Sequence, residues 1–104
     1  MKNNRLVKLL KLESDRPLDP FIKFAIAQEL TREQKPIEAE KKYRSLAENH
    51  PKYTGTYLHW GILLEEIGKE EEAMEIFRRG LEICKEESAQ NDYRELKQAI
   101  DERS

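Results

Sequence analysis

The chain has 104 residues, of which 38% are hydrophobic and 38% are charged, so we expect a single domain with a modest core. Its charges are mixed, and a net charge of −2 gives no electrostatic basis for nucleic acid binding, which usually needs a basic patch. Residues that favour helices (Glu, Lys, Leu, Ala, Arg and Gln) outnumber Val and Thr, which predicts an all-α fold.

Targeting signals are not evident. Lys8 and Lys11 interrupt the leucine-rich N-terminus, so it does not resemble a secretory signal peptide. No apolar stretch approaches the roughly 20 residues of a membrane span. The single cysteine, Cys84, can form no internal disulfide, so an oxidising compartment is not indicated. We therefore expect a cytoplasmic protein without a membrane span.

The first expected element is a short helix or arm over residues 1–13, which carries Leu6, Leu9 and Leu10 on one side. One interpretation is an amphipathic segment for a membrane surface or a partner. The other is an extra helix or arm that lays its leucines on the helices that follow. We favour the second interpretation, because apolar helix faces are generally buried and this segment has no aromatic anchor.

A connector over 14–19 precedes a helix that we expect to begin at Pro20 and to end between Thr31 and Glu33. Asp19 is a good N-cap, and a proline fits the first helical position because it has no N–H to lose there. The next helix is expected over 36–49, between two prolines that respectively begin and stop it.

A second pair of helices is expected over 54–68 and 69–86. Gly68 suits the left-handed conformation that is common at helix C-termini. Gly80 lies inside the second of these helices, where glycine costs about 1 kcal/mol relative to alanine. Close packing against a neighbouring helix would explain its presence.

The last expected helix covers 90–103, with Tyr93, Leu96 and Ile100 as one apolar stripe on a polar helix. We expect this stripe to cover apolar surface around Ile76 and Ile83, while the opposite side stays in water. Such a helix would cap the end of a stacked array.

The stretch 20–53 is similar to the stretch 54–87 when position 20 is aligned with position 54. We call this offset the repeat spacing. Identical pairs at the repeat spacing are Leu30/Leu64, Lys35/Lys69, Glu38/Glu72, Ala39/Ala73, Arg44/Arg78 and Glu48/Glu82. The two stretches therefore read as two copies of one structural unit.

The second copy has Trp60, Gly61 and Leu64 on its first helix, then Ala73 and Phe77 on its second. This order resembles the W-x2-L-G-x2-Y…A-x3-F pattern of the tetratricopeptide repeat (TPR), whose unit length of about 34 residues matches the repeat spacing.

The first repeat departs from the family pattern at three positions. Lys23 replaces an aromatic residue, Gln34 replaces the usual turn glycine, and Leu46 occupies a small-residue position. The N-terminal arm lies outside the resemblance.

The resemblance implies a right-handed α-α superhelix of TPR-like helical hairpins, with about five to six helices. The whole of 1–104 would be a single TPR domain, divided into the arm or helix at 1–13, repeats at 20–53 and 54–87, and a capping helix at 90–103. Stacked repeats of this kind usually bind other proteins. The implied function is that of a non-enzymatic scaffold or adaptor for a protein or peptide partner.

In this family the first helix of each repeat lines a concave groove. The corresponding positions here are Phe21, Phe24, Gln28, Thr31 and Arg32, followed by Gly55, Leu58, Ile62, Glu65 and Glu66. The lysine and asparagine carboxylate clamp of some members is absent. What remains is an apolar strip (Phe24, Leu58 and Ile62) that suits an amphipathic helix or an apolar peptide. Alternatively, the N-terminal arm or a second copy of the chain covers the strip, which would give a monomer or a weak homodimer.

The sequence shows no residue pattern typical of a metal site, a catalytic nucleophile or a phosphate-binding loop. His50 and His59 have no second ligand at metal-binding spacing, and Cys84 has no histidine nearby in sequence. The few glycines are widely spread and form no phosphate loop. We therefore expect no metal, no cofactor and no enzymatic activity.

Overall fold

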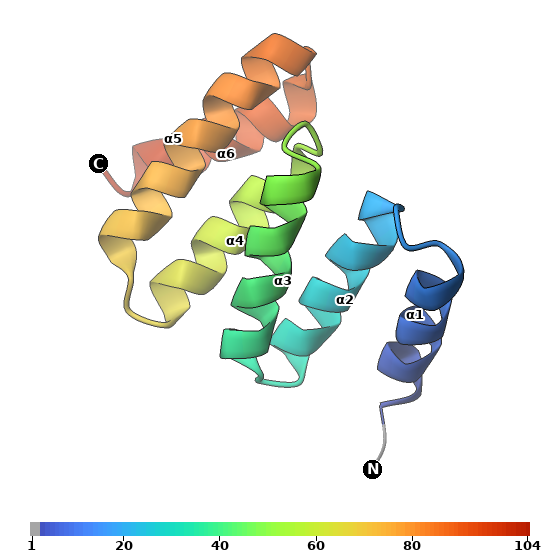
Figure 1. The fold of residues 1–104 in the computed structure, drawn as a ribbon. Helices are drawn as coiled ribbons and strands as arrows, with labels where there is room; N and C mark the ends of the chain where they lie inside the picture. Colours follow the sequence, from blue (N-terminus) through green and yellow to red (C-terminus); the bar gives the residue numbers. More distant parts are fainter. Residues whose placement is uncertain (1–2) are drawn as a thin grey trace.

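The computed structural model describes residues 3–104, and over this range it contains six helices and no strand (Figure 1). The helices are α1 (Asn4–Asp15), α2 (Pro20–Arg32), α3 (Pro36–Asn49), α4 (Gly55–Glu66), α5 (Glu70–Glu87) and α6 (Gln90–Glu102). Each helix packs against the next one along the chain, and the closest pairs are α2 with α3 and α4 with α5. The fold is all-α, as the sequence predicted.

Local sequence signals set the starts of the first helices. The Asp19 carboxylate accepts a hydrogen bond from the Phe21 N–H at 2.9 Å, so it satisfies one of the free donors at the start of α2. The Asn3 side chain does the same for the Leu6 N–H of α1, at 3.0 Å. The predicted starts of α2 at Pro20 and of α3 at Pro36 are confirmed.

The two hairpin turns lie one repeat spacing apart and have the same geometry. Gln34 after α2 and Gly68 after α4 both have a left-handed backbone, with φ of 59° and 85°. The next N–H, from Lys35 or Lys69, donates to the carbonyl of Leu30 at 3.0 Å or of Leu64 at 2.8 Å. This is the Schellman arrangement that satisfies the free carbonyls at a helix end. A non-glycine residue in this conformation costs about 1–2 kcal/mol, so the first turn is the more strained one.

Aromatic side chains fill the core between the hairpins. Trp60, Tyr43, Tyr57 and Phe77 are at most 2% exposed. Gly80 lies against Tyr57, because a Cβ added at position 80 would be only 2.3 Å from the Tyr57 Cβ. The close packing that we expected at Gly80 is therefore confirmed.

The N-terminal segment is helical and packs along α2. Leu6 and Leu9 of α1 are half-buried and contact the core, but Leu10 and Leu12 remain 45% and 42% exposed. The helix continues to Asp15, so it includes two residues that we expected in the connector. Of the described residues of α1, the backbone comes close only to α2.

Ion pairs fix α1 in this place. The Glu13 carboxylate lies 3.1 Å from the Lys23 ammonium of α2 and 3.2 Å from the Lys42 ammonium of α3. Burial alone would raise the pKa of Glu13, but the hydrogen bonds and charges of the two lysines outweigh it and hold the pKa below its usual range. The Glu29 carboxylate, which is buried in α2, forms an ion pair with the Arg5 guanidinium of α1 at 3.3 Å.

Helix α6 lies against α4 and α5 with its apolar stripe inward. Leu96 is fully buried, and Tyr93 and Ile100 are half-buried against the core. Arg94, Glu95, Gln98 and Glu102 are exposed, as expected for the outer side of a cap. The stripe also includes Ala99, at 5% exposure, which the sequence pattern missed.

Candidate protein-interaction surface

A small pocket lies where α2 and α4 come together. It has a volume of about 180 Å³ and is lined by Gln28, Thr31, Arg32, Tyr43, His59, Ile62, Leu63 and Glu66. These residues come from α2, from α4 and from one position of α3. The pocket is large enough for one side chain of a partner rather than for a whole small molecule.

An aromatic cluster adjoins the pocket. The ring of Phe24 lies 5.1 Å from that of His59, 5.7 Å from Tyr53 and 6.2 Å from Tyr43, in edge-on and tilted arrangements. Such edge-to-face pairs are favourable for aromatic rings. The cluster therefore holds Phe24 in place and leaves it half-buried at the surface.

Burial changes the titration of two groups beside this pocket. It raises the pKa of the Tyr43 hydroxyl to about 12, since an ionised phenolate would lose its hydration. It lowers the pKa of His59, because the charged imidazolium is disfavoured in the same way, while Glu95 and Asp92 of α6 partly oppose this effect. Both groups are therefore neutral at pH 7, which keeps the middle of the surface uncharged.

The structure brings together about half of the predicted groove residues. Gln28, Thr31, Arg32, Ile62 and Glu66 line the pocket itself. Phe24 and Leu58 are half-buried and pack against the core beside it. Phe21 is 64% exposed and lies outside the pocket. Gly55 contributes no side chain, but its backbone lies close to the rings of Tyr53 and Phe24.

Two predicted charges are already engaged within the chain. The Glu65 carboxylate receives the guanidinium of Arg103 from the end of α6, with one contact at 2.8 Å. This hydrogen bond and the positive charge lower the pKa of Glu65. Arg32 forms an ion pair at 3.2 Å with the buried Glu29. Glu66 is exposed at the rim of the pocket.

Tyr43, His59 and Leu63 line the pocket but were not among the predicted residues. Tyr43 belongs to α3, and the family pattern marks only the first helix of each repeat. In the sequence, His59 stands out only as a potential metal ligand. The signal that could have found it is its position one residue after Leu58, on the same helix as Ile62.

The described residues also bear on metal binding and on the reactivity of Cys84. Residues 3–104 hold no group of three histidine, cysteine or carboxylate side chains that could bind a metal. Cys84 is buried in α5, and burial raises the pKa of its thiol to about 11, so it is not an activated nucleophile. None of the described helices is long and apolar enough to cross a membrane.

The two helical hairpins repeat their turns and core positions at one fixed spacing, and a surface pocket lies between their first helices. These features define the class of helical repeat proteins. Comparison with solved structures identifies the family. The chain is similar to a TPR domain protein from Salinibacter ruber, whose crystal structure matches at 35% sequence identity and a TM-score of 0.75 over 79% of this chain and 91% of that one. A solution NMR structure of a TPR domain protein from the same organism gives 35% identity and a TM-score of 0.76, with 79% and 83% of the two chains covered.

The chain belongs to the tetratricopeptide repeat family. The family that the sequence pattern suggested is therefore confirmed. A scan against models of protein families gave no match, and a search of curated proteins gave none. The repeats of this family generally form a non-catalytic fold that mediates contacts between proteins, which is the general class of function for this chain.

Proposed function

We propose that the protein is a non-enzymatic scaffold or adaptor that binds an amphipathic helix or an apolar peptide of another protein on the face where α2 and α4 meet. The observation that carries this proposal is the half-buried apolar strip of Phe24, Leu58 and Ile62 beside the small pocket. Incompletely buried apolar side chains that adjoin a pocket commonly mark a contact surface.

The charges around the strip suit such a ligand. Arg32 and Glu66 line the pocket together with the neutral Tyr43 and His59. An amphipathic helix could place an apolar side chain in the pocket and charged residues of opposite sign at the rims. With a volume of about 180 Å³, the pocket accommodates one such anchor, and a single anchor favours a weak, reversible complex.

Charge-insertion variants test the proposal. Leu58→Glu and Ile62→Glu should each abolish capture of the partners that the wild type retains in a pull-down, because a carboxylate would be buried in the contact. Ile37→Glu is the matched control, since Ile37 is 69% exposed on α3 and is not part of the strip. Circular dichroism should show that all three variants are folded. Partners that survive both strip variants would exclude this face as the binding surface.

Self-association is the alternative, and one observation favours it. Leu18 and Phe21 are 80% and 64% exposed and lie close together in sequence, at the start of α2. Large apolar side chains that are this exposed favour contact with another surface, including a second copy of the chain. Light scattering over a wide concentration range should show a dimer in that case. Loss of the dimer on deleting residues 1–13 would place the contact at the N-terminal helix.

The position of the N-terminal helix bears on whether the strip is free to bind a partner or a second copy. The described backbone of α1 approaches only α2, whereas Leu58 and Ile62 lie on α4. This arrangement supports contact of these two residues with another molecule more than coverage by the arm. Their exposed area is available to a partner or to a second copy.

A further inference from the structure

A second apolar hollow lies between α1 and α3, with α2 as its floor. It has a volume of about 600 Å³. Leu6 and Leu10 of α1 form one wall, and the fully buried Ile26 and the 7% exposed Leu30 of α2 lie beneath the floor. Leu10 remains 45% exposed in it. We call this hollow the N-terminal groove; it shares no lining residue with the pocket between α2 and α4.

The corresponding place one repeat later, between α3 and α5 over α4, is filled. When the chain is aligned on itself at the repeat spacing, Trp60 takes the place of Ile26, and Glu40 and Arg44 take the places of Leu6 and Leu10. The Trp60 Nε1–H donates to the Glu40 carboxylate at 2.9 Å. The Arg44 guanidinium lies 5.3 Å from the centre of the indole, which is a favourable cation–π distance.

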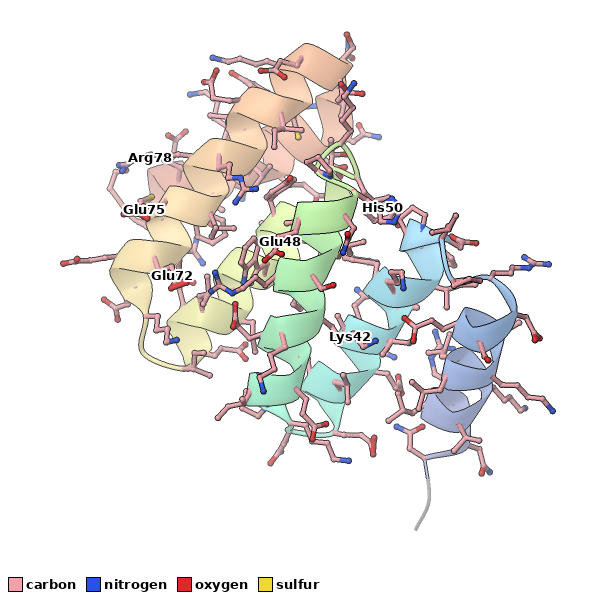
Figure 2. The ribbon with its side chains drawn as sticks, viewed as in Figure 1. Lys42, Glu48, His50, Glu72, Glu75 and Arg78 are labelled. Atoms are coloured by element: carbon pink, nitrogen blue, oxygen red, sulfur yellow. The ribbon has the colours of Figure 1, made fainter. Side chains whose placement is uncertain are left out.

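An ion pair also joins α3 and α5 across Trp60. Arg44 of α3 lies 2.8 Å from the Glu72 carboxylate of α5, which Figure 2 labels on the side of α5 toward α3. The equivalent of Glu72 in the first repeat is Glu38, on the rim of the N-terminal groove. There the equivalent of Arg44 is Leu10, so no such ion pair can form. The N-terminal groove therefore lacks both the large aromatic side chain and the ion pair that fill its counterpart.

The rim of the N-terminal groove is positively charged. Lys35, Lys41 and Lys42 line it together with a single carboxylate, Glu38. Lys42, which Figure 2 labels on the side of α3 toward α2, is already paired with Glu13 at 3.2 Å. Lys35 and Lys41 are exposed and form no ion pair with the described part of the chain. The groove therefore offers an apolar floor and at least two lysines that an acidic ligand would complement.

We propose that the N-terminal groove binds an acidic amphipathic helix of another protein, which inserts a large aromatic side chain against the exposed Leu10 and places its carboxylates against Lys35 and Lys41. The aromatic side chain would occupy the space that Trp60 fills in the second repeat. The carboxylates would supply the charge complementarity that Arg44, Glu40 and Glu72 supply there. This site is additional to the proposed surface between α2 and α4, and a single chain would hold two partners at once.

The test uses a defined probe. A helical peptide with one central tryptophan and a glutamate-rich flank is titrated into the full-length, methyl-labelled protein, and the NMR shifts of the leucine and isoleucine methyl groups are recorded. The control peptide carries lysines in place of the glutamates. The acidic peptide should shift the methyl signals of Leu6, Leu10 and Leu30, and it should bind more tightly than the basic one. Raising the salt concentration should reduce this difference, because exposed charges are screened.

Matched variants locate the site. Leu10→Glu should weaken binding of the acidic peptide by about tenfold or more, as expected for the loss of a central contact, and Lys41→Glu should weaken it and reduce its salt dependence. Ile37→Glu adds the same charge to α3 at a position outside the groove and should change neither the affinity nor the shifts. Leu10 and Lys41 are exposed, so both variants should keep the wild-type melting temperature.

Three outcomes would overturn the proposal. The first is equal binding of the acidic and basic peptides. The second is an affinity that Leu10→Glu does not change. The third is a set of shifts confined to Ile62 and its neighbours, which would assign the peptide to the surface between α2 and α4 and leave the proposed function standing without this second site.

Discussion

Gly61 of α4 lies directly against the ring of Phe77 of α5, so that a Cβ added at position 61 would be 2.2 Å from the Phe77 Cε1. Phe77 is fully buried and cannot move into solvent. The missing side chain at position 61 is what allows α4 and α5 to approach closely enough to bury the ring. The close packing of the second hairpin therefore depends on this pair, together with Gly80 against Tyr57.

Gly61→Ala should destabilise the protein by about 1–3 kcal/mol, the usual range for overpacking a core, even though alanine favours a helix by about 1 kcal/mol over glycine. Urea unfolding monitored by circular dichroism measures the change. Adding Phe77→Leu to Gly61→Ala should recover part of the loss, because the smaller side chain relieves the clash. A higher urea midpoint for Gly61→Ala alone would mean that the two helices are not in close contact here.

The two hairpin turns offer a paired test of backbone strain. Gln34 has φ of 59° and is exposed, so Gln34→Gly should stabilise the protein by up to about 1 kcal/mol. Gly68→Gln should destabilise it by a similar amount, since nothing within 4 Å of an added Cβ would complicate the comparison. Melting temperatures measure both changes. Equal melting temperatures for all three proteins would contradict a left-handed conformation at these turns.

Trp60→Ala should cost about 3–5 kcal/mol, as expected for truncating a large core aromatic. The side chain is 2% exposed and its N–H bonds to Glu40 at 2.9 Å. Domains of this kind have total stabilities of about 5–15 kcal/mol, so the variant could be largely unfolded in mild denaturant. Trp60→Phe is the milder control, which retains most of the apolar volume. Solvent-like fluorescence of Trp60 in the native protein would contradict its burial.

We predict that protonation of His59 lowers the free energy of unfolding in mild acid. Burial lowers its pKa in the folded state below the ordinary value of 6.5, so the unfolded chain binds the proton more readily. The stabilisation is present above the unfolded pKa and is lost as pH falls toward the folded pKa. The free energy of unfolding should therefore decrease between about pH 7.5 and 5.5. His59→Leu should remove most of that decrease, whereas His50→Gln should leave it; the same slope in His59→Leu would assign the effect to other groups.

Removal of α6 should expose the core of the second repeat. Leu96 is fully buried and packs tightly over Gly80, where an added Cβ would be 3.1 Å from the Leu96 Cδ1, and Ala99 is 5% exposed. A protein truncated after Glu87 should melt at a lower temperature and aggregate, because an uncapped repeat presents apolar surface to water. Differential scanning calorimetry and light scattering measure the two effects. Unchanged melting and a monomeric state would mean that α6 is a tail and not a cap.

The sequence predicted those features that depend on local or periodic signals. Proline positions and the Asp19 cap set the starts of α2 and α3, and the repeat spacing indicated the family. The same family positions placed Gln28, Arg32 and Ile62 at one pocket. Their role in binding stays a prediction.

Features that depend on contacts between distant segments were not predicted. The ion pair between Glu65 and Arg103 joins α4 to the end of α6, and no local pattern marks it. Tyr43 is buried in the core and reaches the pocket from α3, outside the helices that the family pattern marks. The N-terminal groove depends on the tertiary fold, since its lining comes from α1, α2 and α3.

The end of α1 has the geometry of the end of α3, which lies one repeat spacing further along the chain. Arg16 has φ −133° and ψ 68°, and His50 has φ −137° and ψ 65°. Their N–H groups donate to Leu12 and Leu46, at 2.8 and 2.7 Å. The chain thus leaves α1 along the path by which it leaves α3, and a gene carrying an added copy of residues 20–53 after residue 53 should yield a longer array with unchanged junctions. Each added copy would bring Ile26 beneath the Glu40–Arg44 face of the preceding α3, creating a new groove whose chemistry the designer could choose.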